Sequence, residues 1–156
     1  MHLCRPPLPL SRLQPEYRFI RTLQAPDHVV LDKNAGRYRI SSKAFGPSRS
    51  DGGLSGDLEQ PLVADGLPAL ALYPAVDRAV GAASLTVGQI LAHGGLSVQH
   101  VPVRSNWYHG NILGITGGIK KRLSKQALEI VPIDQDAAAR RDALRSQAAG
   151  LGQTAD

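Results

Sequence analysis

The side chains best suited to chemistry gather in one short span, residues 101–115 (VPVRSNWYHGNILGI). This span holds the only tryptophan of the chain, together with Arg104, Asn106, Tyr108 and His109, and then continues as an apolar run typical of a strand. His109 is the best single candidate for catalysis, because an imidazole titrates near neutral pH and can act as a general base or bind a phosphate. Its place at a loop-to-strand junction suits a functional residue held by a rigid scaffold.

The same residues also have structural interpretations, and the sequence leaves these open. The ring of His109 could instead cap a strand end or bond a backbone carbonyl. Arg104 could bind a phosphate or carboxylate beside the imidazole if the loop folds back, or it could be a solvated arginine stacked on Trp107. Trp107 itself is expected to pack in the core rather than to offer a stacking surface. We therefore take Arg104, Asn106 and Trp107 as candidate binding residues, and His109 as catalytic only if the protein is an enzyme.

The chain is basic, with 18 Lys and Arg against 13 Asp and Glu, a formal net charge of +5 and a pI of about 9.7. Such a balance favours a phosphate-bearing or acidic partner. Residues 119–128 (IKKRLSKQAL) place apolar side chains at helical spacing with bases between them, which predicts an amphipathic helix with a basic outer face. Further candidate binding residues are therefore Lys120, Lys121 and Arg122 on this helix, and Arg37 and Arg39 on an alternating segment predicted to be a strand.

Several kinds of site are disfavoured by residue type and spacing. Cys4 is the only cysteine, so neither an intrachain disulfide nor a cysteine-based zinc site can form. His93, His100 and His109 lack the spacing of a helical metal pair, and the glycines of residues 110–118 form neither a dinucleotide motif nor a phosphate loop. No candidate serine lies in a nucleophile-elbow motif. We expect no metal ion and no other cofactor.

The pattern along the chain predicts a small single α+β domain with a mixed or antiparallel sheet, two or three helices and flexible termini. Residues 1–15 are expected to be a proline-rich arm, residues 16–133 the domain, and residues 134–156 a flexible or weakly helical tail. Residues 46–68, rich in Gly, Ser, Pro and Asp, are expected to be a long loop without regular structure.

Within the domain, most segments have one preferred conformation. Strands are predicted at residues 16–22 (with a short helix as the alternative), 29–31, 37–41, 69–72, 96–101, 111–115 and 129–132. Helices are predicted at residues 74–80 and 119–128, and a third between a Thr86 N-cap and Gly94.

Four short motifs, read in order, resemble a group of small bacterial proteins of unknown function. They are RISSKAF (residues 39–45), LS (54–55), Gly81 followed by LTVG (85–88), and NWYHGNI (106–112), against (V/I)SSxAF, LS, GVxxVTV and NPxHAxI in that group. The resemblance covers roughly residues 16–115, although Trp107-Tyr108 and Gly110 depart from the last motif. It carries no activity with it, but implies that seven positions matter: Ser41, Ser42, Phe45, Ser55, Thr86, Asn106 and His109.

With no catalytic constellation in view, we expect a cytoplasmic, non-enzymatic interaction module of a bacterial protein assembly. Its basic surface would bind a protein or nucleic-acid partner, and no membrane partner is expected. The alternative is a small toxin-like enzyme acting on a nucleotide or phosphorylated substrate, with His109 as acid/base. A His109 ring in an open cleft beside an arginine or serine would favour the enzyme, and a ring buried among aliphatic side chains would count against it.

Overall fold

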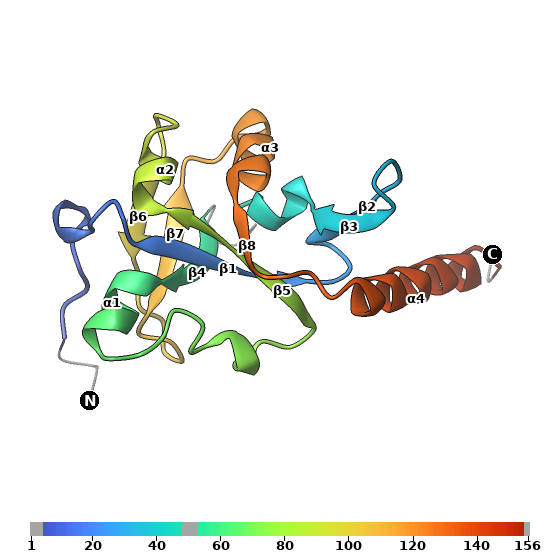
Figure 1. Cartoon of the computed structure of the whole chain (residues 1–156), viewed down its shortest axis with the longest axis horizontal. Helices are drawn as coiled ribbons and strands as arrows, with labels where there is room; N and C mark the ends of the chain where they lie inside the picture. Colours follow the sequence, from blue (N-terminus) through green and yellow to red (C-terminus); the bar gives the residue numbers. More distant parts are fainter. Residues whose placement is uncertain (1–4, 48–52, 155–156) are drawn as a thin grey trace.

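An antiparallel sheet of six strands, in the order β6-β7-β4-β1-β5-β8, organises the chain, and two further strands form a separate hairpin (Figure 1). The computed structural model describes residues 5–47 and 53–154, with side chains as far as residue 150. The strands are β1 (Arg18–Gln24), β2 (Val29–Asp32), β3 (Arg37–Ile40), β4 (Leu54–Leu58), β5 (Ala79–Thr86), β6 (Ser97–His100), β7 (His109–Leu113) and β8 (Leu128–Val131). The α-helices are α1 (Glu59–Ala64), α2 (Val87–Leu91), α3 (Gly117–Gln126) and α4 (Gln135–Thr154), and the 3-10 turns are η2 (Leu10–Arg12), η3 (Ser42–Phe45) and η4 (Tyr73–Ala75).

The predicted α+β class with an antiparallel sheet is confirmed, and the described residues form four α-helices rather than two or three. The extra helices are α1, inside the segment expected to be a loop, and α4 at the C-terminal end. None of the helices in the described part of the chain is both long enough and apolar enough to cross a bilayer.

One face of the sheet carries the hydrophobic core. Phe19 of β1 and Leu58 of β4 are register partners and are almost fully buried. Gly56 and Gly110 pair between β4 and β7 on this same face. A Cβ at Gly56 would collide with the ring of Phe19, and one at Gly110 would lie 2.7 Å from Cγ of Leu58. Glycine is therefore required at both positions, because the core side chains fill the space above them.

The opposite face of the sheet is polar where β4 meets β7. Side chains alternate between faces along a strand, so Asp57 and His109, which are register partners, point away from Phe19 and Leu58. Ser55 and Asn111 form the next pair, with Ser55 Oγ 3.5 Å from Asn111 Oδ1. The helix α1 lies on this side of the sheet, away from α2 and α3 (Figure 1).

Helix α2 begins after Thr86, the N-cap residue that the sequence predicts. Thr86 Oγ1 accepts the N–H of Gln89 at 3.0 Å, and Gln89 Oε1 accepts the N–H of Thr86 at 2.9 Å. This reciprocal capping box confirms Thr86 as the N-cap. Gly94 adopts a φ of 71°, the left-handed conformation that glycine tolerates after a helix.

Residues 46–68 are not the long irregular loop that their composition predicts. They contain β4, an inner strand of the sheet, and α1 directly after it. The strand LSGDL was missed because its glycine and aspartate are typical of turns, whereas here Gly56 makes room for Phe19 and Asp57 faces away from the core.

Residues 69–80 also differ from the predictions. The expected strand at 69–72 is a turn, and the expected helix at 74–80 is limited to the 3-10 turn η4, after which β5 begins at Ala79. The Pro74 signal marks a turn here rather than a longer helix.

The half-buried His28 and the buried His100 bond the backbone in the neutral state. Nδ1 of His28 accepts the N–H of Gln24 at 3.0 Å, and Nδ1 of His100 accepts the N–H of Leu8 at 2.9 Å. Burial, together with the positive charge of Arg21, lowers the pKa of His28 to about 4. Protonating Nδ1 would break its hydrogen bond, so the folded state resists protonation there.

Acid should therefore destabilise the protein through His28. The folded pKa of about 4 lies below the ordinary value of 6.5, so the unfolded chain binds this proton first as the pH falls. The His28 contribution is complete above pH 6.5 and is lost towards pH 4, a change of about 3 kcal/mol in the free energy of unfolding. His28→Gln, which keeps an acceptor for Gln24, should flatten this slope in urea denaturation measured across that range. His93→Gln is the control, and an equally steep slope in both variants would contradict the assignment.

Candidate functional site

A basic groove with a volume of about 590 Å³ lies between the β2–β3 hairpin and the α3–β8 segment. Four cationic side chains line it: Arg37, Arg39, Lys121 and Lys125. Glu129 is the one carboxylate of the lining, and its Oε1 accepts the N–H of Ile133 at 3.2 Å. We call these lining residues the basic groove. Positive charge thus prevails along a concavity that two distant parts of the chain build.

Helical periodicity decides which bases of α3 reach the basic groove. Lys121, Ser124 and Lys125 lie three and four residues apart on one face, while Leu123 is fully buried on the core side. Of the three predicted residues on this helix, Lys121 alone lines the groove, and Lys120 and Arg122 lie to either side of that face. Lys125 was not among the predicted binding residues, although its position four residues after Lys121 is the signal that could have found it.

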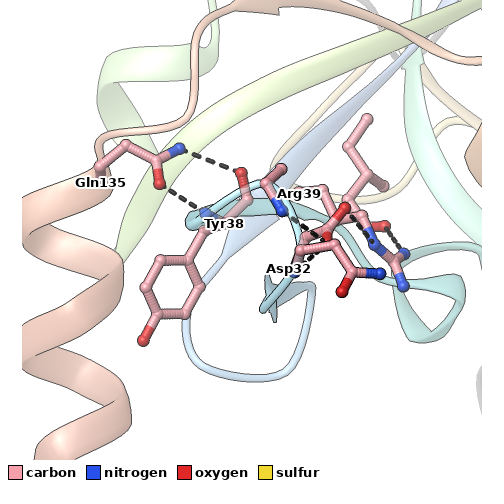
Figure 2. Close-up of polar contacts among 7 residues, drawn as sticks. Asp32, Tyr38, Arg39 and Gln135 are labelled. Atoms are coloured by element: carbon pink, nitrogen blue, oxygen red, sulfur yellow. Dashed lines mark hydrogen bonds and ion pairs between the residues drawn. The ribbon is translucent and has the colours of Figure 1, made fainter.

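The alternation of side chains along β3 directs the other two cations, Arg37 and Arg39, to the basic groove. In β3, Tyr38 and Ile40 are buried, whereas Arg37 and Arg39 are exposed. Nε of Arg39 lies 3.9 Å from Oδ2 of Asp32, and its Nη1 donates to the carbonyl of Ile40 at 3.3 Å (Figure 2). These contacts are long, and the Arg39 side chain remains 59% exposed. Both predicted arginines therefore lie where a ligand in the groove can reach them.

The hairpin is held in place by α4. The side-chain amide of Gln135 accepts the N–H of Tyr38 and donates to its carbonyl, closing a two-bond clamp on the outer edge of β3 (Figure 2). The hydroxyl of Tyr38 donates to Asp142 Oδ2 at 2.8 Å, and Ala138 is fully buried at the contact. The first turns of α4 thus fix the wall of the groove that carries Arg37 and Arg39.

The residues around Trp107 form a separate unit. Asn106 Nδ2 donates to Asp57 Oδ1 at 2.8 Å, and Asn106 Oδ1 accepts the N–H of Tyr108 at 2.9 Å. The indole of Trp107 is half-buried, with its ring edge-on to His100 at 4.9 Å and the guanidinium of Arg5 over it at 4.6 Å. The cation beside the ring is Arg5, not the Arg104 that the sequence suggests.

Within the described residues no hydrogen bond joins Arg104 and His109. Arg104 is exposed in the loop, whereas Nδ1 of His109 lies 2.8 Å from the carbonyl oxygen of Val101. The imidazole is half-buried and borders a small hollow on the polar face of the sheet, together with Asp57. Burial raises the pKa of Asp57, and the Asn106 hydrogen bond and the nearby His109 act in the opposite direction.

Comparison with protein-family models, curated proteins and solved structures finds no match to this chain.

Three of the seven positions that the bacterial resemblance singles out have architectural roles. Ser41 Oγ accepts the N–H of Lys43 at 3.2 Å and caps η3, Phe45 is buried in the core, and Thr86 caps α2. Ser41 and Ser42 also border the basic groove.

The described residues offer no evident metal site. Nowhere in residues 5–47 and 53–154 do three His, Cys, Asp or Glu side chains gather as ligands would. Cys4 lies outside the described residues.

Removing the Gln135 clamp should loosen the hairpin without unfolding the sheet. Gln135→Ala deletes two hydrogen bonds to Tyr38 and leaves two backbone groups to find water, which should cost about 1–2 kcal/mol in the free energy of unfolding. Amide hydrogen exchange of Tyr38 should become faster while that of β1 and β5 stays slow. Gln147→Ala, the same change at an exposed position of α4, is the control. Unchanged Tyr38 exchange in Gln135→Ala would show that the clamp is not what holds β3.

Proposed function

We propose that this protein is a non-enzymatic interaction module that binds nucleic acid through the basic groove. The observation that carries the proposal is the convergence of Arg37, Arg39, Lys121 and Lys125 on one concave surface against a single carboxylate of the lining. Lys120 and Arg122 extend the positive field beside it. A row of cations facing one way is what a phosphate backbone requires, since each neutralised phosphate releases counterions.

The chemistry of the groove favours binding that depends little on base sequence. The one aromatic residue of the lining, Tyr38, is buried and so offers no stacking platform. Leu128 is 67% exposed and Val30 is 38% exposed, which leaves apolar surface for sugars or bases to contact. Affinity should therefore come mainly from phosphate contacts, with strong salt dependence. We further propose a cytoplasmic protein that works within a bacterial assembly, where nucleic acid is available to it.

An acidic protein segment is the other partner that suits this charge. The groove's exposed apolar side chains would serve either partner, but the basic residues outside it, Lys120 and Arg122, favour a long polyanion over a short peptide.

The geometry around His109 meets one expectation for an enzyme, because His109 borders a hollow together with Ser55, but it does not favour a phosphorylated substrate. The hollow beside His109 contains the carboxylate of Asp57, which would repel a phosphate unless it were protonated. The nearby Arg21 donates to the carbonyls of Ala44 and Ser55, both at 3.0 Å, and lies on the core-facing side of β1.

The proposal predicts a charge-specific and salt-dependent loss of binding. Lys121→Ala combined with Lys125→Ala should weaken binding to short labelled RNA and DNA strands, measured by fluorescence anisotropy between about 50 and 200 mM salt. If both lysines contact phosphates, the slope of log K against log salt should become shallower by ~1.4–1.8, since each lost contact removes ~0.7–0.9.

The matched control is Arg140→Ala combined with Arg141→Ala, which removes the same charge from α4 outside the groove. Equal losses in both double variants would mean that only overall charge matters, and the groove would lose its role. Failure of any oligonucleotide to bind, while a poly-glutamate peptide binds and depends on Lys121 and Lys125, would replace nucleic acid with an acidic protein partner.

A further inference from the structure

A second, smaller hollow of about 160 Å³ lies where β1, β4 and β7 meet on the polar face of the sheet. Asp57 and His109 face it from neighbouring strands, Ser55 and Thr22 add hydroxyls, and Ile20 and Val76 add apolar surface. None of its lining residues belongs to the basic groove. It is therefore a separate site, and its lining carries one carboxylate, Asp57, and one guanidinium, Arg21.

The tautomer of His109 leaves one ring nitrogen available to this hollow. Because the carbonyl of Val101 can only accept, Nδ1 must carry the proton and Nε2 the lone pair in the neutral ring. His28 and His100 have the reverse arrangement, with Nδ1 accepting a backbone N–H. Among the described residues no side chain or backbone group bonds Nε2 of His109, and no buried side-chain nitrogen or oxygen lacks a partner. Nε2 is therefore open to solvent.

Asp57 likewise has one carboxylate oxygen that accepts a hydrogen bond and one that does not. Asn106 donates to Oδ1, and no group of the described residues donates to Oδ2. By the same reasoning Oδ2 is not buried. The asparagine also holds the carboxylate in position, because Asn106 Oδ1 is fixed by the N–H of Tyr108. Asp57 and His109 thus each have one further acceptor, Oδ2 and Nε2, and both residues border the same hollow from neighbouring strands.

The polar lining and the volume of this hollow indicate which class of ligand would fit it. Asp57 is the one acidic residue of the lining. Arg21 also borders the hollow, but its guanidinium donates to the carbonyls of Ala44 and Ser55 on the core-facing side of β1. An ammonium group has three N–H donors, which match Asp57 Oδ2, His109 Nε2 and Ser55 Oγ as acceptors. A metal ion fits less well, since no third strong ligand joins the pair in the described part of the chain.

We propose that the hollow of Asp57, His109 and Ser55 binds a primary alkylammonium group, with Ile20 and Val76 against its alkyl chain. Its volume accommodates a small alkylamine or the end of a lysine side chain. The two sources, a free amine or a lysine of a partner protein, share this chemistry. The inference is independent of the basic groove and of any nucleic-acid binding.

The test is an NMR titration of the ¹⁵N-labelled protein with n-butylammonium chloride, with tetramethylammonium chloride as the control for ionic strength and charge. We expect saturable shifts at residues 55–57 and 109–111 with the primary amine only. Asp57→Asn should weaken binding at least tenfold by removing the charge, and Asp77→Asn, an exposed carboxylate next to Val76, should leave it unchanged.

A second variant distinguishes loss of amine binding from loss of the fold. Val76→Phe should fill the hollow and abolish the shifts without altering a charge or a strand. A parallel titration with a lysine-containing peptide distinguishes the sources: tighter binding of the peptide than of butylammonium indicates a protein lysine, and the reverse indicates a free amine. Absence of saturable shifts, equal shifts with tetramethylammonium, or full binding by Val76→Phe would overturn the proposal.

Discussion

The absence of two side chains, at Gly56 and Gly110, is the constraint on which much of the architecture depends. These register partners let Phe19 and Leu58 lie directly on β4 and β7, so that the core reaches down to the backbone. Strand alternation then directs the intervening Asp57, and its partner His109, to the opposite face. The close packing of one face and the polar character of the other are therefore consequences of the same register.

The two hollows are built by different parts of the chain. The basic groove is built by the hairpin, α3 and β8, whereas the hollow beside Asp57 is built by β1, β4 and β7. The helix α4 supports the wall of the groove that β3 forms, because Gln135 bonds both backbone groups of Tyr38 (Figure 2). A helix with little apolar surface can perform this task because hydrogen bonds and the buried Ala138, rather than a broad hydrophobic stripe, dock its first turns.

Local signals in the sequence predict local structure well. The capping residue Thr86, the alternation through Arg37–Ile40 and the apolar spacing from Ile119 are each read from neighbouring residues, and the corresponding elements are present. The strand β4 could not be recognised in this way, since Gly56 matches its surroundings only once Phe19 is above it. The basic groove was beyond prediction for a related reason: Arg37 and Lys121 meet through tertiary packing, and no spacing in the chain encodes that meeting.

The N-terminal arm gives the two edges of the sheet different properties. At β6, Leu8 donates its N–H to His100, and Arg5 lies over Trp107, so the chain's own arm lies against that end. At the other end, β8 pairs with β5 alone and begins with the highly exposed Leu128. Edge strands are where sheets recruit further strands from other chains. The β6 edge is thus contacted by the chain's own arm, whereas no strand of the described residues pairs with the outer side of β8, beside the basic groove.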